Sequence, residues 1–264
     1  MSDFLYAERL EQIIKTTKLL LICMLLLLTG CASIPSDSEV AGDPWESYNR
    51  SVDGFNEGVD QYVAIPLAEA YQVVTPDVVD HGVSNFFGNL LDVNSAVNNL
   101  FQLKIDRAVS DVVRVMINST IGLFGFFDIA SDLNLPSYKE DFGQTLGYWG
   151  VGSGPYFVLP FLGPSSVRDT VGLLADVMMN PLTLANLTAA ESAVATSVYY
   201  IDRRADLLEA VALINEAAID PYAFIRDAYL QQRISLVYDG DPPMSDEEEL
   251  MMDEDFEDEL DEDF

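Results

Sequence analysis

Histidine, cysteine and basic residues are scarce in this chain of 264 residues. One histidine, two cysteines and 13 lysines and arginines stand against 44 acidic residues, a formal net charge of −31. A transition-metal site usually takes several imidazole or thiolate ligands, so we expect no metal and no other cofactor. The acidic balance repels phosphates and no basic patch is present. We therefore expect no nucleic-acid partner.

Catalytic motifs are equally scarce. Asp80 precedes His81, the one histidine, but adjacent residues on a helix point in different directions and form no relay. Ser153 lacks the G-x-S-x-G elbow of hydrolases, because Val151 stands two residues before it. We expect that the chain is not an enzyme. A membrane-bound lipid hydrolase using Ser153 or His81 is the enzymatic alternative.

The chain also lacks an apolar run long enough to span a bilayer. The longest, Leu19–Leu28, covers about 15 Å as a helix, whereas a hydrocarbon core is roughly 30 Å thick. Two lysines precede it and small residues follow it, the order of a secretory signal. The letters LTGC that end at Cys31 resemble the bacterial lipobox. We expect cleavage between Gly30 and Cys31 and lipidation of Cys31; a buried N-terminal helix is the alternative.

These expectations divide the chain into four parts. Residues 1–30 form the lipoprotein signal peptide, which removes Cys23, so the mature chain has no disulfide. Residues 31–43 form the lipidated N-terminus and a flexible tether, and residues 44–238 are long enough for one domain. Residues 239–264 hold 15 acidic residues and no lysine or arginine, a composition typical of disorder. This tail either keeps the protein solvated or docks to a partner through its interspersed apolar residues.

The domain has the periodicity of helices rather than strands. Asp43, Pro44 and Glu46 predict a capped helix start. An aromatic-rich apolar stripe at helical spacing follows: Trp45, Tyr48, Val52, Phe55, Val59 and Tyr62. Further helices are expected from Thr75-Pro76, from about Asp106, from Val194 to about Ala218, and from Asp220-Pro221. The helix from Thr75-Pro76 is expected to continue and to bury Val93, Val97, Leu100 and Phe101. The fold class is therefore predicted to be all-α.

Two features do not fit an ordinary helical bundle. Ser119–Ala130 and Gly143–Pro164 are apolar, glycine-interrupted stretches that fit either a membrane interface or loops that cross the core. A cluster of neutral amides follows residue 84 in this acidic protein: Asn85, Asn89, Asn94 and Asn98. An amide face can hydrogen-bond a lipid headgroup without repelling its phosphate, and it can equally join helices to one another. Both interpretations stay open.

Five long motifs together resemble the MlaA/VacJ family of outer-membrane lipoproteins. They are DPWESYNR, VSNFFGNL, INSTIGLFGFFDIA, FGQTLGYWGVGSGPYFVLPFLGPSSVRD and DPYAFIRDAYLQQR, which occur in order over about residues 43–233. The resemblance implies a lipid-anchored protein on the periplasmic side of the outer membrane of a Gram-negative bacterium. It also implies a single ring-like domain of amphipathic helices in one membrane leaflet, with a central amphipathic channel.

The same resemblance implies a function and partners. Mislocalised phospholipids are removed from the outer leaflet and passed through the channel to a soluble periplasmic carrier, and then to an inner-membrane ABC transporter system. A trimeric outer-membrane porin stands beside the ring. A hairpin lining the channel would contain Gly122, Leu123, Phe124, Gly125 and Phe126, and the amides Asn85, Asn89, Asn94 and Asn98 would be a second candidate for its polar lumen. The alternative is a structural lipoprotein that scaffolds a porin.

Overall fold

The computed structural model describes residues 43–185 and 187–243. All of them belong to one compact unit, Val40–Met244. The predicted signal peptide (1–30), Gly30 and Cys31 lie outside the described residues. So do the predicted tether up to residue 42 and the acidic tail from residue 244.

The described residues form helices and one short hairpin, so the predicted all-α class is confirmed. The helices are α2 (Glu46–Val59), the π-helix η1 (Asp60–Ala64), α3 (Ile65–Val74), α4 (Asp77–Phe101), α5 (Ile105–Thr120), α6 (Ile129–Asp132), α7 (Phe142–Tyr148), α8 (Val167–Met179), α9 (Pro181–Leu184), α10 (Ala189–Asp206), α11 (Leu208–Ala217) and α12 (Pro221–Val237). Strands β1 (Tyr156–Leu159) and β2 (Gly163–Ser166) pair antiparallel in the glycine-rich stretch, Tyr156 opposite Ser166. No helix of the described residues combines the length and apolar character needed to cross a membrane.

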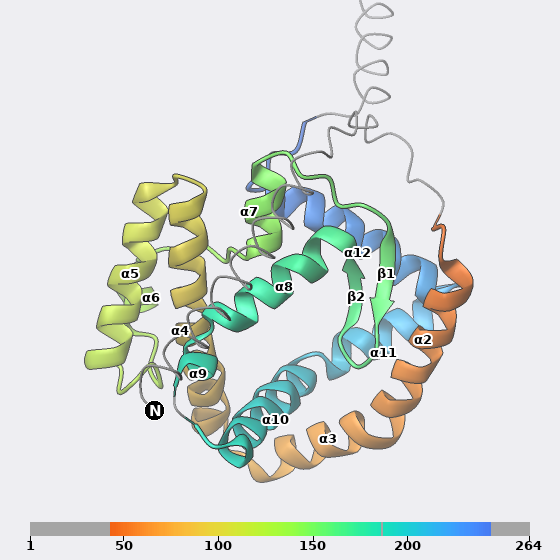
Figure 1. The fold of residues 1–264 in the computed structure, drawn as a ribbon. Helices are drawn as coiled ribbons and strands as arrows, with labels where there is room; N and C mark the ends of the chain where they lie inside the picture. The colour runs from red at the N-terminus through yellow and green to blue at the C-terminus, as the bar shows by residue number, and fades with distance from the viewer. Residues whose placement is uncertain (1–42, 186, 244–264) are drawn as a thin grey trace, which may run out of the picture. The chain divides into compact units, whose positions relative to one another are not determined.

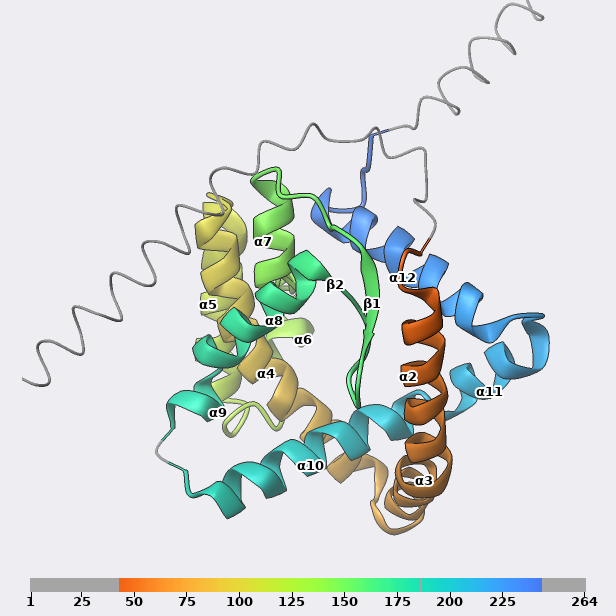
Figure 2. The ribbon, with the colours of Figure 1, turned by 45° about the vertical axis from the view of Figure 1, so that its right-hand side comes forward.

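Within this unit the helices follow one another in a closed circuit. Helix α2 continues through η1 into α3, and the chain turns at Thr75 and Pro76 into the long α4. Helix α4 packs on α7, which packs on α12. The circuit closes where Arg50 of α2 forms an ion pair with Asp220 at the start of α12, at 2.7 Å. Figures 1 and 2 show α8 and the β1–β2 hairpin inside this circuit, with α10 crossing between α3 and α4.

The ends of the helices follow the sequence signals only in part. Asp220 caps α12 as predicted, because its carboxylate accepts a hydrogen bond from the backbone N–H of Ala223 at 3.2 Å. The predicted cap at Asp43 is wrong: α2 begins at Glu46, with Trp45 in the cap position. The Asp43 carboxylate instead accepts the backbone N–H of Trp45 at 3.1 Å and the amide of Asn49 at 2.8 Å.

A second correction concerns the long helix expected from Val194 to about Ala218. The chain breaks at Leu207 into α10 and α11, although the apolar spacing continues through the break. Apolar periodicity indicates which residues share one face of a helix. It does not indicate whether the helix changes direction between two turns, so the break at Leu207 could not be predicted from it. Among the described residues, α10 also has a complete capping box between Thr188 and Glu191.

The interior of the unit is polar, which the sequence interpretation did not anticipate. Among the described residues, glycines apart, eighteen buried residues are polar or charged and ten are apolar, and five of those ten are alanines. Val93 and Val97 are only partly buried, and Leu100 and Phe101 are exposed, whereas Asn98 on the same helix is fully buried. The predicted burial of the apolar side of α4 is therefore wrong for its second half.

The same reversal holds for the first helix. The aromatic stripe of α2 and η1 is largely exposed, with Tyr62 79% exposed, while Asn49 of α2 is completely buried. Asn49 accepts the backbone N–H of Val158 at 2.8 Å and donates to the backbone oxygen of Tyr156 at 3.2 Å. This asparagine fastens α2 to β1 through hydrogen bonds that an apolar side chain cannot replace. A small apolar cluster around Tyr156, Val158 and Tyr222 packs beside it.

Candidate functional site

The amide face of α4 is one wall of the polar interior. Asn85 and Asn89 donate to the hairpin segment and to α5, at the Phe126 oxygen (3.2 Å) and the Ser119 hydroxyl (3.0 Å). Asn94 and Asn98 donate toward α8, at the backbone oxygen and the carboxylate of Asp176, both 3.2 Å. All four amides thus hydrogen-bond neighbouring elements. Whether they also meet a lipid headgroup stays a prediction.

Helices α4 and α5 are joined through buried charges. Arg114 of α5 donates to Asp92 of α4 at 3.2 Å, and both side chains are at most 4% exposed. The same guanidinium reaches Asp128, which follows the hairpin, at 3.0 Å. Burial opposes ionisation of Asp128, but hydrogen bonds from Ser131, Asn118 and Arg114 outweigh it and hold its pKa at about 2. These bonds fix the base of the hairpin to the α4–α5 pair.

The predicted hairpin, Gly122–Phe126, lies in the turn between α5 and α6. Leu123 and Phe124 have positive φ angles of 53° and 61°, and their side chains are 61% and 78% exposed. Gly125 has a φ of 91°, and a Cβ there would lie 2.7 Å from Asn89. The structure thus shows an apolar tip held in a left-handed backbone that residues other than glycine rarely adopt.

The first glycine of this turn and the last phenylalanine are tightly packed. A Cβ on Gly122 would lie 2.2 Å from the backbone oxygen of Phe127, and a Cβ on Gly82 would lie 2.1 Å from the Phe126 ring. Gly122 and Gly125 are therefore both positions where neighbouring atoms approach too closely for a side chain.

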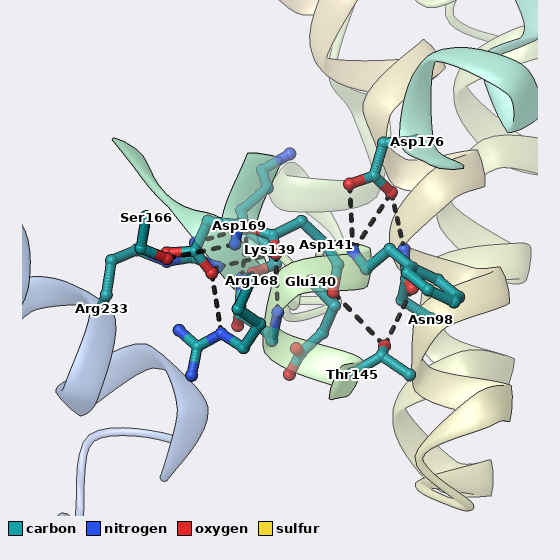
Figure 3. A network of polar contacts seen from close by, with 12 residues as sticks. Asn98, Lys139, Glu140, Asp141, Thr145, Ser166, Arg168, Asp169, Asp176 and Arg233 are labelled. Atoms are coloured by element: carbon teal, nitrogen blue, oxygen red, sulfur yellow. Dashed lines mark hydrogen bonds and ion pairs between the residues drawn. The ribbon is translucent and has the colours of Figure 1, made fainter. Parts of the chain in front are cut away.

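A second charged cluster joins α7, α8 and α12 (Figure 3). Arg233 of α12 donates to Asp141, the cap of α7, at 2.9 Å and to Asp169, in the first turn of α8, at 3.0 Å. Arg168 also donates to Asp169, at 2.9 Å. Burial opposes ionisation of both carboxyls, but the hydrogen bonds and charge of the arginines outweigh it, so the pKa values of Asp141 and Asp169 lie below their ordinary range.

An amphipathic cavity of about 280 Å³ lies against this cluster. Its lining combines charged, hydroxyl and apolar side chains from the cap of α7, from the β1–β2 hairpin, and from α8, α10 and α12: Asp141, Leu159, Leu162, Pro164, Ser165, Asp169, Leu173, Asp176, Tyr200, Tyr229 and Arg233. Such a wall offers hydrogen-bonding groups and apolar contact side by side. A molecule with a polar head and an apolar body matches that surface.

Asp176 is the carboxylate of this wall that differs from the other two. It accepts the backbone N–H of Phe142 at 3.0 Å and the amide of Asn98 at 3.2 Å, both neutral donors (Figure 3). Among the described residues no ion pair within 4.0 Å involves it. Burial raises the pKa of Asp176 to about 6, although the hydrogen bond from Phe142 opposes that rise.

A larger, almost wholly apolar cavity of about 530 Å³ lies between α2, β1 and α8. Trp45, Tyr48, Phe157, Val167, Thr170 and Val171 line it. Trp45 and Tyr48 belong to the aromatic stripe at the start of α2, and Phe157 comes from β1. The Thr170 hydroxyl lies 2.8 Å from that of Ser165, which lines the amphipathic cavity. The two cavities are therefore separated by the hydrogen bond between Ser165, which lines one, and Thr170, which lines the other.

The residues weighed for hydrolysis do not assemble in the described part of the chain. His81 is exposed on α4, and Ser153 precedes β1, where its backbone oxygen accepts the N–H of Arg168 at 3.0 Å. No hydrogen bond joins His81 to Ser153 within residues 43–185. No group of three or more histidine, cysteine or acidic side chains in the described ranges is arranged to hold a metal ion.

Sequence reasoning missed the charged clusters. Asp169 and Arg233 end two of the motifs that carry the family resemblance, SSVRD and DPYAFIRDAYLQQR, so a signal was present. Asp169 and Arg233 lie 64 residues apart in the sequence, and Asp141 and Arg233 lie 92 residues apart. Nothing in residue spacing indicates that pairing, because it depends on how three helices pack.

Comparison with known proteins gives consistent matches over the described unit. The model of the MlaA lipoprotein family matches residues 41–235. The intermembrane phospholipid transport system lipoprotein MlaA of Escherichia coli is 35% identical over 219 residues, 81% of this chain and 86% of that protein. Its counterpart in Haemophilus influenzae is 32% identical over 232 residues, 85% and 92% of the two chains.

A solved structure from work on the structural basis for maintenance of bacterial outer membrane lipid asymmetry is also similar. It matches with a TM-score of 0.66 and 35% identity, over 74% of this chain and 98% of that one. The family model covers well over half of the chain, and the relatives agree with it along most of their own length. The chain therefore belongs to the MlaA lipoprotein family.

Proposed function

We propose that this protein is an outer-membrane lipoprotein that removes mislocalised phospholipids from the outer leaflet. It passes them through a channel toward the periplasm and so maintains the lipid asymmetry of the membrane. Relatives more than 30% identical are named for an intermembrane phospholipid transport system. The proposal extends that function to this chain, and the structure supplies a physical basis for it.

The observation that carries the proposal is the reversed placement of polar and apolar side chains. Polar residues outnumber apolar ones among the buried side chains, and large apolar residues such as Tyr62, Val73 and Phe124 are highly exposed. Soluble monomers rarely expose extended apolar surface, whereas membrane-contacting proteins do. The exposed apolar side chains of α2, α3 and α5 suit the hydrocarbon of one leaflet, and the polar interior with its amphipathic cavity suits a lipid in transit.

The energetics of moving a phospholipid explain why such a covered path is needed. About 30 acyl methylenes at about 0.8 kcal/mol each would cost roughly 24 kcal/mol to expose to water. A path that keeps the tails on apolar walls and the headgroup on polar ones removes most of that cost. No bond is made or broken in such a transfer, so the proposed function is not enzymatic.

Anchoring and partners complete the proposal. Cys31 carries the acyl chains after cleavage behind Gly30, and three chains hold a protein far more firmly than one. A trimeric porin accompanies the protein in the outer membrane, a soluble periplasmic carrier receives the lipid, and an inner-membrane ABC transporter system acts downstream. The hairpin Gly122–Phe126 lies beside the lipid path, with its apolar tip exposed.

The test is complementation of a strain that lacks this gene, with a leaflet-specific assay of surface phospholipid. Cys31→Ser should leave phospholipid in the outer leaflet, as the deletion does. Cys23→Ser is the matched control, because that cysteine leaves with the signal peptide, and it should restore asymmetry fully. Complete rescue by Cys31→Ser would contradict the anchored channel. Normal leaflet composition with lost porin assembly in the deletion strain would favour the scaffold alternative.

A further inference from the structure

The wall of the amphipathic cavity has more negative charge than its own cations balance. Three carboxylates line it, Asp141, Asp169 and Asp176, against one arginine, Arg233. That arginine already donates to Asp141 at 2.9 Å and to Asp169 at 3.0 Å. Arg168 adds a second donor to Asp169, at 2.9 Å. The positive charge near the cavity is therefore committed to two of its three acids.

The surroundings of Asp176 are short of cationic hydrogen-bond donors. Its carboxylate accepts from the Phe142 N–H and the Asn98 amide, and its backbone oxygen accepts from the Asn94 amide. Asn94 is 5% exposed, and its own side-chain oxygen has no hydrogen-bond partner among the described residues. A buried acceptor without a donor costs free energy. The Asp176 carboxylate lines the cavity, and a cationic group with several N–H bonds would satisfy it.

Cavity size limits what can bind there. Pockets that enclose whole drug-sized ligands measure about 300–1,000 Å³, and this cavity holds about 280 Å³. It can take a phospholipid headgroup and the first part of the tails, but not the tails in full. Leu159, Leu162 and Leu173 supply the apolar part of its wall.

We propose that Asp176 binds the primary ammonium of a phospholipid headgroup, so that the path prefers ethanolamine-type lipids to anionic glycerol-type lipids. The inference rests on the proposed function and adds the headgroup class. A primary ammonium brings one positive charge and three donors, which is what this wall lacks. A headgroup with no positive charge brings only its phosphate close to three carboxylates. A quaternary choline headgroup brings the charge without the N–H donors and should rank between the two.

The experiment uses the full-length lipidated protein reconstituted into vesicles with equal amounts of phosphatidylethanolamine, phosphatidylcholine and phosphatidylglycerol. The protein is re-isolated in detergent, and its retained lipids are counted by mass spectrometry. We expect phosphatidylethanolamine to be enriched over phosphatidylglycerol about tenfold, the factor that one charge-assisted hydrogen bond of about 1.4 kcal/mol gives. Asp176→Asn should bring the enrichment to within about twofold, while total retained lipid changes little.

Two further variants make the result specific. Asp176→Glu keeps the charge and should keep the order of the three lipids. Asp206→Asn makes the same chemical change at an exposed position of α10 outside the cavity wall, and it should behave as the wild type. Circular dichroism verifies that each variant is folded. We expect Asp176→Asn to fold, since the amide oxygen that it introduces can still accept the Phe142 N–H.

The outcomes separate this inference from the proposed function. If the wild type retains phospholipids in the proportions of the vesicle, or if Asp176→Asn keeps the enrichment, headgroup selection by Asp176 is wrong while lipid transport stands. If the wild type retains no more phospholipid than a protein-free detergent control, the lipid-binding function itself fails. Enrichment of phosphatidylglycerol would overturn the charge argument directly.

Discussion

Replacing Arg233 by methionine should destabilise the protein strongly, because it removes the cation that Asp141 and Asp169 share. The guanidinium is 12% exposed, and its partners Asp169 and Asp141 are 8% and 38% exposed. Removing one partner of a buried ion pair typically costs about 3–5 kcal/mol. We expect the lower end, about 3 kcal/mol, because Asp169 keeps Arg168 and Asp141 is partly solvated. For a domain of this size that corresponds to a fall in Tm of about 6–12 °C.

The assay is thermal unfolding of the full-length protein in detergent, followed by circular dichroism. Arg226→Met is the matched control, since it makes the same change on the same helix. Within residues 43–185 and 187–243, Arg226 forms an ion pair only with its sequence neighbour Asp227, at 2.8 Å, and so links α12 to no second element there. Its Tm should fall much less than that of Arg233→Met. Equal losses for the two variants would contradict the assignment of Arg233 as the link between α12, α7 and α8.

The pH dependence supplies an independent check with a defined sign. Burial raises the pKa of Asp141 and of Asp169, but Arg233 outweighs burial, so both values lie below normal in the folded state. A depressed folded pKa gives stability that is present above the unfolded value, about 3.9, and lost as pH falls through the folded value. The Tm difference between wild type and Arg233→Met should thus be largest near pH 7 and shrink below about pH 4. A difference that stays constant down to pH 3 would refute the electrostatic reasoning.

Two further predictions concern the reversed interior and the hairpin. Asn49→Ala should lower the free energy of unfolding in detergent by about 2–4 kcal/mol, because it leaves two buried backbone groups of β1 without their hydrogen-bond partner. Tyr62→Ala, at an exposed position of η1, is the control and should change Tm little. Gly122→Val and Gly125→Val should impair outer-leaflet lipid removal while the protein stays in the membrane, since neither site has room for a Cβ. Gly58→Val, where a Cβ meets open space, is their control, and wild-type asymmetry in both hairpin variants would argue against a role in transport.

The helices of this fold were predictable because their two faces differ so clearly in polarity. The stripe from Trp45 to Tyr62 and the capped start at Asp220 both correspond to observed helices. The direction of burial was not predictable, since periodicity shows that two faces differ and not which of them meets the interior. The usual assumption that apolar means buried fails on α2 and on the second half of α4.

The candidate site was less predictable than the fold. The amides of α4 were found from composition, and the structure shows them bonded between helices, as one of the two open interpretations held. The pairing of Arg233 with Asp141 and Asp169 was not found, because contacts across 92 and 64 residues follow from packing alone. Sequence can indicate that a charged residue stands in a distinctive motif. It does not indicate which acid that residue meets.

A polar interior raises the question of what stabilises this protein. Buried ion pairs are often no more stabilising than apolar side chains of the same volume, so clusters such as Arg114 with Asp92 are poor substitutes for an apolar core. Apolar side chains that stay exposed to water contribute nothing to the stability of the fold. In contact with acyl chains they are removed from water, and this burial is favourable. Under the proposed function, the leaflet therefore takes the place of part of the core. The buried ion pairs then have a different role, which is to hold polar walls in fixed positions where a headgroup has to pass.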